Sequence, residues 1–370
     1  MKITIFDSVS DQYGSSRICR LIMQILRDAG HDVNAYVCVE RLPESQHYAR
    51  TIAFPMLVMT YLRKAPLSYI RDLFVRIRTF RANLPMLLAD TDLVYCNTLG
   101  TLPVAWCCKL RGIPTVLHLH ETANSAFMRF VGRLVLPQVA DRVLCVSAAV
   151  AQSWQIDHHP NTRVIHNGIP DLSHPERAET NAPRPYDLCF VGRLTEKKGI
   201  GFFLAALDVL SRAQPPRFDR PLKVVIAGGT LPGQPVPLEL EAIASRANMQ
   251  ITYLGEIDDA SEVFLQSKVA CVPSLFHDPF PTVVLEAMRA GCSVVASELG
   301  GAREALAGAC GELVPPGDVA ALVEAIVRQH AEWGPASISH NRQVFTEQFT
   351  FEQFRGRLLT LDLFHSNQSR

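Results

Sequence analysis

The stretch Tyr186–Phe203, YDLCFVGRLTEKKGIGFF, holds a short apolar run, a glycine turn and the start of a second apolar segment. The run before Gly192 is almost uniformly apolar and only as long as a strand, which is typical of a parallel sheet covered on both faces. Lys198 and Gly199 follow where a helix would begin. A strand, a glycine turn and a helix in this order indicate an α/β fold.

The same alternation runs along nearly the whole chain of 370 residues. In the first half the apolar runs are KITIF, VNAYVCV, LVYC, TVLHL, RVLCVS and RVIH, and in the second they are DLCFVG, LKVVIAGG, QITYLG, KVACVP and SVVAS. Between the halves lies a polar, proline-rich stretch with the composition of a linker. We therefore predict two facing Rossmann-like doubly wound α/β domains with a cleft between them, at residues 1–171 and 186–345, joined by a linker at 172–185. A single large domain with a long insertion is the alternative.

The composition excludes a strong overall charge, because 36 basic residues balance 36 acidic ones. We therefore expect no nucleic-acid partner, and any anion site must be built locally. The chain opens on the strand-like MKITIF without a signal-peptide layout, and its longest apolar run, TIAFPMLVMTYL, is too short to cross a bilayer. The ten cysteines include no C-x-x-C pair. These features favour a cytoplasmic protein with free thiols.

Ligands of doubly wound sheets bind beyond the carboxyl ends of the strands, so the loops there hold the candidate site. Gly14 comes after the first strand and just before a helix that opens with Ser15 and Ser16, which suits the approach of a phosphate or an ordinary turn. His118 and His120 share one face of a strand that Glu121 follows, so the three could bind a metal; one structural histidine and one at the strand tip is the plainer interpretation. The pair Asp90-Thr91-Asp92 has a pattern by which some transferases hold a divalent ion, and here we interpret it as a polar turn.

The second half offers a more specific constellation. Arg193 at a strand end and Lys198 at the next helix start would converge on one spot, as an anion site requires; a solvated basic turn is the alternative. Gly228-Gly229 leaves room for a flat ring or a phosphate. Thr282 begins a helix, and Glu286 lies on the same face about 6 Å along the axis. A carboxylate below an anion site suits a polyol such as ribose.

These motifs together resemble the retaining glycosyltransferases of family 4, which have the GT-B fold. The resemblance covers essentially the whole chain. It rests on R-x4-K-G at 193–199, on the acid-x7-E of Asp278 and Glu286 within PFPTVVLEAMRAG, on Gly300-Gly301 followed by Glu304, on GELVPPGD, on VIHNGI, and on His120 six residues after Pro114.

The resemblance implies a role for each matching residue. Arg193 and Lys198 would hold the nucleotide diphosphate in place of a metal, and Glu286 would bind the ribose. Asp278 would contact the donor sugar, and His120 would lie near its anomeric carbon. The implied catalytic residues are His120, Asp278, Arg193 and Lys198. The implied nucleotide-sugar site consists of Gly14, Gly192, Arg193, Lys198, Gly228, Gly229, Leu254, Phe280, Pro281, Thr282, Val283 and Glu286. The sequence departs from the family where Asp278 replaces the usual glutamate and where the first loop lacks a second glycine.

The expected reaction moves a hexosyl or deoxyhexosyl unit, with retention, from a UDP-, GDP- or dTDP-sugar to a glycan or lipid-linked acceptor without a metal cofactor. Synthesis of a bacterial surface polysaccharide is the expected setting, and residues 346–370 would form a helix that crosses back to the first domain. A glycoside hydrolase could use the Asp278–Glu286 pair but has no need of the adjacent cations. A non-catalytic GT-B subunit would keep the fold and lose the site. A Rossmann dehydrogenase would need a G-x-G-x-x-G motif, and none follows any predicted strand of this sequence.

The segment YLRKAPLSYIRDLFVRIRTFRANL predicts a membrane contact at the inner face of the membrane. Its basic residues face a single acid, Asp72, with aromatic residues between them: Arg63, Lys64, Arg71, Arg76, Arg78 and Arg81. A basic amphipathic helix can lie on anionic lipid. A solvated helix face that packs by its apolar side is the alternative.

Overall fold

The computed structural model describes residues 1–8, 14–38, 50–52, 66–179, 183–231 and 233–364. Contacts divide the chain into two compact units, the first formed by residues 1–167 with the segment from 354 onward, and the second by residues 168–353. The stretch 172–185, predicted as a linker, belongs to the second unit and contains helix α7 (Glu176–Glu179).

Unit 1 is built on a parallel seven-stranded sheet with the order β3-β2-β1-β4-β5-β6-β7. Its strands are β1 (Lys2–Asp7), β2 (Asp32–Cys38), β3 (Arg50–Ile52), β4 (Leu93–Asn97), β5 (Thr115–Leu119), β6 (Arg142–Cys145) and β7 (Thr162–Val164). Every residue of β4 and β5 is buried, as expected for central strands covered on both faces. The apolar runs of the sequence therefore mark the middle of this sheet.

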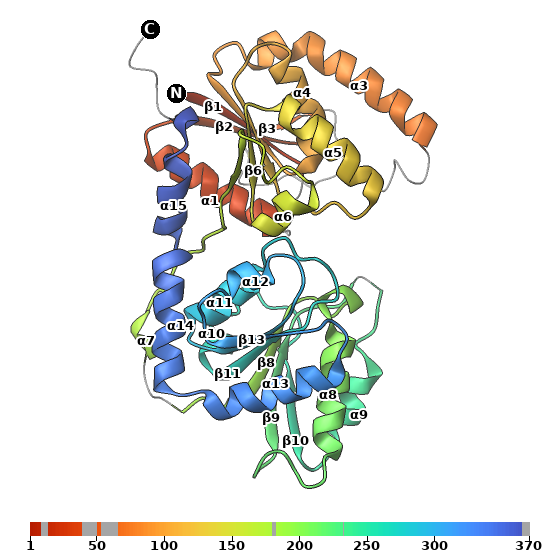
Figure 1. Cartoon of the computed structure of the whole chain (residues 1–370), viewed down its shortest axis with the longest axis vertical. Coiled ribbons are helices and arrows are strands. Elements are labelled where there is room, and N and C mark those ends of the chain that lie inside the picture. Colours follow the sequence, from red (N-terminus) through yellow and green to blue (C-terminus); the bar gives the residue numbers. More distant parts are fainter. Residues whose placement is uncertain (9–13, 39–49, 53–65, 180–182, 232, 365–370) are drawn as a thin grey trace. The chain divides into compact units, whose positions relative to one another are not determined.

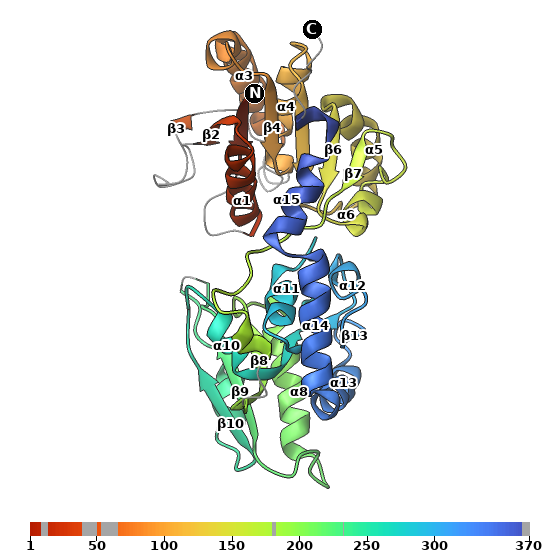
Figure 2. The ribbon, with the colours of Figure 1, turned by 90° about the vertical axis from the view of Figure 1, so that its left-hand side faces the viewer.

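Helices cover both faces of this sheet, with α1 on one side and α4 and α5 on the other (Figures 1 and 2). The helices are α1 (Gly14–Asp28), α3 (Pro66–Leu87), η2 (Leu99–Thr101), α4 (Leu102–Lys109), α5 (Ala126–Val139), α6 (Ala148–Ser153), α15 (Phe351–Leu359) and η4 (Asp362–Phe364). Helix α1 forms because Ile18, Ile22, Ile25 and Leu26 recur at helical spacing and are buried together. Its opposite face stays polar.

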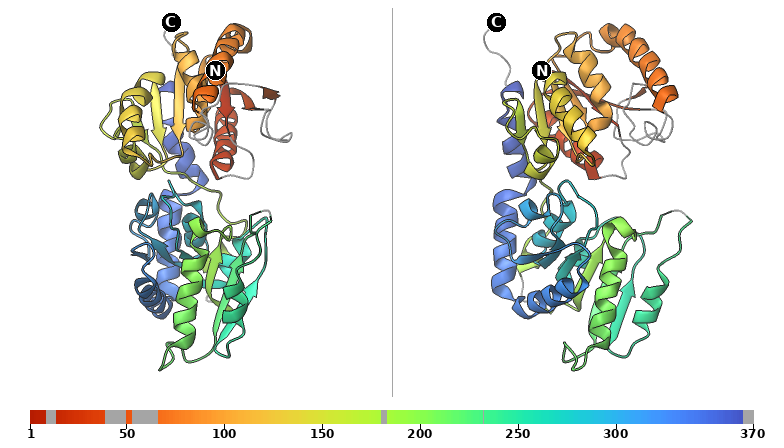
Figure 3. Two further views of the ribbon diagram at one scale, coloured as in Figure 1. Left: turned by 90° about the vertical axis from the view of Figure 1, so that its right-hand side faces the viewer. Right: turned by 45° about the vertical axis from the view of Figure 1, so that its right-hand side comes forward.

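Unit 2 repeats the plan with a parallel six-stranded sheet in the order β10-β9-β8-β11-β12-β13. Its strands are β8 (Tyr186–Val191), β9 (Leu222–Ala227), β10 (Met249–Tyr253), β11 (Ser267–Val272), β12 (Ser293–Ser297) and β13 (Gly311–Val314). Its helices are α7, η3 (Glu196–Lys198), α8 (Ile200–Arg212), α9 (Leu238–Ala244), α10 (Ser261–Leu265), α11 (Thr282–Arg289), α12 (Ala302–Ala305), α13 (Val319–Glu332) and α14 (Pro335–Gln348). Figure 3 shows α8 beside α13, with α11 and α14 across the sheet from them.

Both sheets reverse their winding direction at one point, between β1 and β4 in unit 1 and between β8 and β11 in unit 2. The chain leaves the two neighbouring strands in opposite directions there, and this opens a crevice at their carboxyl ends. The predicted doubly wound fold is thus confirmed in both halves. The sequence missed two short edge strands, β3 and β13.

The C-terminal segment consists of two helices, α14 and α15, with a break between them. At this break the main-chain N–H of Ile169 donates to the carbonyl of Phe349, at 2.9 Å. Residues 354–364 belong to unit 1, where Arg357 donates to the carbonyl of His166. The nine cysteines whose side chains the structure describes are free thiols, and eight of them are buried. Among the described helices, none combines the length and apolar character that a membrane crossing requires.

Candidate active site

A buried carboxylate marks the winding reversal of unit 1. Asp7 ends β1, is fully buried, and accepts hydrogen bonds from the Ser16 hydroxyl at 3.1 Å and from the Asn97 amide at 3.0 Å. Asn97 ends the neighbouring strand β4, while Ser16 lies in the first turn of α1. These hydrogen bonds join the ends of β1 and β4 to the start of α1.

His118 of β5 and His120, which follows this strand, lie side by side at this edge, with their ring centroids 4.3 Å apart. His118 is fully buried, and its Nδ1 shares a 2.7 Å hydrogen bond with the Tyr95 hydroxyl. Burial lowers the pKa of His118 and lowers the pKa of His120 to about 3. Both rings are therefore neutral at pH 7. Within the described residues, the buried Nε2 atom of each has no hydrogen-bond partner, so His120 can offer a neutral imidazole to a ligand.

The possible metal ligands of unit 1 are engaged in other ways. The Glu121 carboxylate accepts main-chain N–H groups of Leu99 and His120. Asp90 and Asp92 lie at the opposite edge of the sheet, where Asp92 accepts the main-chain N–H of Lys2 at 2.7 Å and Asp90 pairs with its ammonium at 3.2 Å. Across the part of the chain that the structure describes, no three histidine, cysteine or acidic side chains are grouped to hold a metal ion.

Gly14 is the first residue of α1, whereas the sequence predicts it just before this helix. A Cβ placed there would meet nothing within 4 Å of the described residues. The described neighbours therefore do not require a glycine. A close approach of a phosphate or an acceptor to Gly14 stays a prediction.

In unit 2, glycines bring the ends of β8 and β9 into close contact. Gly192 and Gly228 have φ angles of 151° and 142°, and a Cβ on Gly228 would lie 2.0 Å from the Gly192 carbonyl oxygen. The N–H of Leu194 donates to the carbonyl of Gly229 at 2.9 Å. Only glycine allows this approach without displacing the backbone. The sequence missed Tyr253, whose hydroxyl donates to the Gly228 carbonyl at 3.1 Å.

The start of α8 meets the end of β11 in the same way. Gly199 is left-handed, with φ 78°, and a Cβ there would lie 1.8 Å from the Pro273 carbonyl oxygen. This contact places Lys198 beside the loop after β11, where its ammonium pairs with Asp278 at 2.9 Å and lies 4.9 Å from the Phe276 ring centroid. The structure thus joins a predicted phosphate-binding cation to a predicted sugar-binding acid.

The loop from Asp278 to Pro281 rests on two further glycines. The N–H of Gly301 donates to the Asp278 carbonyl at 2.9 Å. A Cβ on Gly300 would lie 2.0 Å from the Asp278 carbonyl oxygen, and a Cβ on Gly301 would lie 2.2 Å from the Pro279 carbonyl oxygen. The sequence noted the glycine pair without its function. Its absence of side chains lets the loop pack against it and fixes the entry to α11.

Helix α11 presents Thr282 and Glu286 on one side, whereas most of its other residues are buried. Thr282 and Glu286 are partly exposed one turn apart, whereas Val284, Leu285, Ala287 and Met288 are buried. Phe280, just before the helix, is buried against the Phe349 ring. The Glu286 carboxylate therefore lies at the surface of the unit rather than inside its core. This arrangement puts the carboxylate on the same side of the helix as Thr282.

All predicted residues of unit 2 lie at one edge of its sheet. They follow strands β8 to β11 directly or begin the next helix: Gly192, Arg193, Lys198, Gly228, Gly229, Leu254, Asp278, Phe280, Pro281, Thr282, Val283 and Glu286. The Arg193 and Leu254 side chains are exposed there. Cations, glycines and hydroxyl-binding groups on one edge suit an anionic ligand that also carries a polyol.

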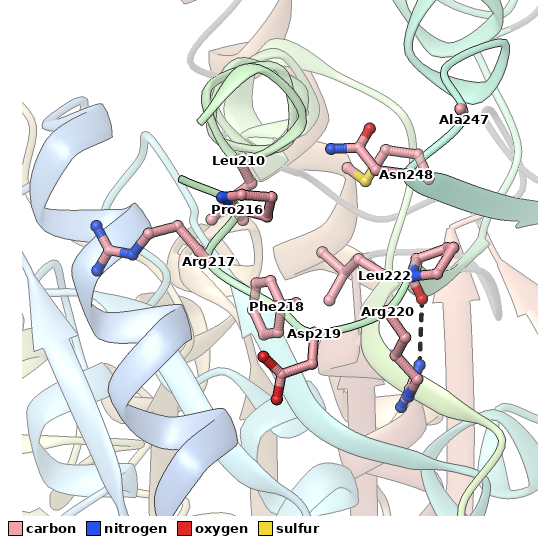
Figure 4. Close-up of a pocket in the computed structure, with 11 residues that line it drawn as sticks. Leu210, Pro216, Arg217, Phe218, Asp219, Arg220, Leu222, Ala247 and Asn248 are labelled. Carbon is pink, nitrogen blue, oxygen red and sulfur yellow. Dashed lines mark hydrogen bonds between the residues drawn. The ribbon is translucent and has the colours of Figure 1, made fainter. Parts of the chain in front are cut away.

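A hollow of about 260 Å³ lies at the other edge of this sheet, where β9 and β10 begin (Figure 4). Its lining includes Leu210, Phe218 and Arg220. The Arg220 guanidinium is already paired with Asp187, at 2.6 and 2.8 Å. Because the amino ends of the strands form this hollow, it is separate from the glycine-rich edge described above.

Comparison with known proteins identifies the family. Residues 13–171 match the family model described as Glycosyltransferase Family 4, and residues 185–332 match that of Glycosyl transferases group 1. The chain belongs to this glycosyltransferase family. Among solved structures, this glycosyltransferase is similar to HepE from Anabaena in complex with UDP, with a TM-score of 0.71, 21% identity, and 97% and 98% of the two chains covered. This likeness shows the GT-B fold.

Two curated relatives are phosphatidyl-myo-inositol mannosyltransferases. The enzyme of Mycolicibacterium smegmatis is 27% identical over 322 residues, which span 83% of this glycosyltransferase and 78% of that enzyme. The enzyme of Mycobacterium leprae is 29% identical over 238 residues. That match spans 60% of this chain and 59% of the length of the relative.

We expect Gly228→Ala to disturb the glycine-rich edge of the glycosyltransferase. The added methyl must push the ends of β8 and β9 apart, at a cost of roughly 2 kcal/mol or more, and displace Arg193. Gly201→Ala in α8 is the matched control, because a methyl there meets nothing within 4 Å and should raise helix stability by about 0.5–1 kcal/mol. Chemical denaturation measures both. Equal stability of the two variants would contradict the packing described.

Proposed function

We propose that this glycosyltransferase moves a hexosyl or deoxyhexosyl unit from a UDP-, GDP- or dTDP-sugar to a glycan or lipid-linked acceptor, with retention, in the synthesis of a bacterial surface polysaccharide. The observation that carries the proposal is the Lys198–Asp278 ion pair at the winding reversal of unit 2. Helix α11, which contains Glu286, begins four residues after Asp278. HepE, with the same fold, has been solved with UDP-glucose, and the curated mannosyltransferases are named for a lipid acceptor.

The cations of the glycine-rich edge would stabilise the leaving group. A nucleoside diphosphate departs readily once its developing negative charge is neutralised, so fixed positive charges supply most of the catalysis. Arg193 and Lys198 are placed for this task at the end of β8 and the start of α8. Lys198 is now paired with Asp278, so a donor diphosphate would take over part of this interaction. No metal is needed in this scheme.

The acids of the loop and helix after β11 would bind the neutral parts of the donor. Glu286 can accept two hydrogen bonds from the vicinal hydroxyls of ribose, and Thr282 lies one turn nearer the helix start. Asp278, which pairs with Lys198, would contact the donor sugar. Its pairing with Lys198 disfavours the alternative of a hydrolase, in which this carboxyl would act freely as an acid or nucleophile.

His120 would serve the sugar from unit 1. A ring with a pKa of about 3 is a poor base, so its neutral Nε2 would exchange a hydrogen bond with a sugar hydroxyl near the anomeric carbon. Retention would then follow from attack on the same face that the diphosphate leaves. In this step the new glycosidic bond forms as the old one breaks, and a departing phosphate oxygen takes the acceptor proton.

Two substitutions test the proposed donor site. Glu286→Ala removes the ribose acceptor and should weaken binding of both free nucleoside diphosphate and nucleotide-sugar about ten- to a hundredfold. Asp278→Ala should leave the affinity for the free nucleoside diphosphate nearly unchanged and reduce turnover sharply. Calorimetric titration and transfer assays with a panel of sugar nucleotides measure these effects. Equal loss of free-nucleotide affinity in both variants, or no turnover of any sugar nucleotide by the wild type, would refute the assignment.

Removal of metal ions tests the role of the two cations. If Arg193 and Lys198 neutralise the diphosphate, transfer should continue at an unchanged rate in excess EDTA. The control is Lys198→Ala, whose activity added Mg²⁺ should not restore. A loss of wild-type activity in EDTA that Mg²⁺ or Mn²⁺ reverses would overturn metal independence.

We further propose that unit 1 contacts anionic lipid at the surface formed by α3, α4 and α5. Helix α3 packs against α4, and α4 packs against α5 (Figure 1). This surface exposes a set of large apolar side chains: Ile70, Phe74, Val75, Trp106, Leu110, Phe127, Phe130, Val131 and Leu134. Arg129 and Arg133 lie among those of α5, a helix without an acidic residue. The predicted Arg63 and Lys64 lie outside the described residues.

The sequence predicts the membrane contact on α3, whereas the most exposed large apolar side chain of this surface, Phe127, lies on α5. Phe127 and Phe130 are 74% and 63% exposed and share one face of the helix. An exposed apolar stripe between arginines fits the boundary between lipid headgroups and acyl chains. A lipid-linked acceptor would be met at such a surface.

Flotation with anionic vesicles at low salt tests this contact. The wild type should float with the vesicles, and Phe127→Ser combined with Phe130→Ser should reduce binding about tenfold or more. Leu238→Ser is the matched control, because Leu238 is 77% exposed in unit 2. Absence of wild-type binding, or equal binding by the two variants, would count against the proposed surface.

A further inference from the structure

Glu121 joins two strand ends of unit 1 through its carboxylate. Its Oε2 accepts the main-chain N–H of Leu99 and that of His120, each at 3.0 Å. The Glu121 carbonyl oxygen accepts the Trp154 indole N–H at 2.7 Å. Leu99 follows β4 and His120 follows β5, so one side chain holds the main chain at both ends. Its own backbone is anchored by Trp154.

The residue before Leu99 is held in an unusual conformation. Thr98 has φ 71° and ψ 158°, a region that β-branched residues rarely adopt. Its N–H donates to the His118 carbonyl at 2.8 Å, and its hydroxyl meets that of Ser8. Such a conformation persists only where the surroundings hold it, and it is concentrated at functional sites. The next residue, Leu99, is held by the hydrogen bond from its main-chain N–H to the Glu121 carboxylate.

We propose that Glu121 is a positioning residue for sugar transfer, whose carboxylate holds the Thr98–Leu99 turn and the main chain of His120 as the reaction requires. The proposal rests on the proposed function. It follows from geometry, because both bonds reach main-chain groups, and one of these groups belongs to His120, the residue that the proposed function assigns to the sugar. Movement of His120 by about 1 Å would be enough to reduce transfer about a hundredfold.

The charge on Glu121 supports a role in function over one in stability. Burial raises the pKa of Glu121 to about 7, the bonds from Leu99 and His120 act in the opposite direction, and the charge of Asp7 raises it further. The other titratable groups at this edge, His118 and His120, are neutral. Because the folded state holds the proton of Glu121 more tightly, the contribution of this residue to stability is highest below about pH 4.5 and falls as the pH rises to 7. Glutamine would avoid this cost, whereas an ionised carboxylate makes the stronger hydrogen bonds.

Three variants test the proposal. Glu121→Ala should lower kcat about a hundredfold while the KM for the sugar nucleotide changes less than about twofold. Glu121→Gln mimics the protonated acid and should lose about tenfold at pH 8. The wild-type rate should fall toward that of the glutamine variant at pH 6. Asp28→Ala, an exposed acid of α1, should behave as the wild type.

Two results would overturn the positioning role: a kcat ratio of wild type to Glu121→Gln that is the same at pH 6 and pH 8, or an equal loss in the glutamine and alanine variants. If Glu121→Ala does not fold, this ratio still decides. Amide NMR of the full chain separates this proposal from the proposed function. The Leu99 and His120 signals should shift with a midpoint near pH 7 in the wild type and not in Glu121→Gln. Signals that do not titrate would refute the hold even if transfer is observed.

Discussion

The parallel pairing of β8 with β11 is the constraint on which the unit 2 site depends. It sets Leu188 beside Val269 and Phe190 beside Cys271, so the two strands end together although about 80 residues separate them. Only then can Gly199 pack against the carbonyl of Pro273 and bring Lys198 to Asp278. A slip of one residue would turn every side chain of β11 to the other face and separate the pair. Unit 1 repeats the device, with Asp7 beside Asn97.

Two acids, Asp187 and Glu121, lie at opposite edges of their sheets and have opposite pKa shifts. Asp187, at the amino end of β8, is buried beside Arg220, Lys268 and His330; hydrogen bonds from these groups outweigh burial and lower its pKa. Its charge therefore contributes stability above about pH 4, which is lost as the pH falls. Glu121, at a carboxyl end, shows the opposite shift. An acid that costs stability when ionised is better explained by the ligand edge it helps to build.

The sequence predicts the doubly wound fold and the edge that carries the site, because uniform apolar runs mark buried parallel strands. It misses β3 and β13, since RTI and GELV are too short and too polar to stand out. It places Arg193, Lys198 and Glu286 near one another through strand-end reasoning alone. The ion pair of Lys198, the packing of the loop after β11 against Gly300-Gly301 and the strained conformation of Thr98 depend on tertiary contacts. No local pattern encodes them.

The central claim is that the glycine-rich edge of unit 2 binds a nucleoside diphosphate sugar. A crystal structure of the full chain with a sugar nucleotide chosen by thermal shift tests it most directly. The account predicts diphosphate oxygens within hydrogen-bond distance of Arg193 and Lys198, ribose hydroxyls on Glu286, and the sugar beside Asp278. A nucleotide seated in the hollow near Arg220, or a diphosphate bound through a metal ion away from both cations, would contradict it.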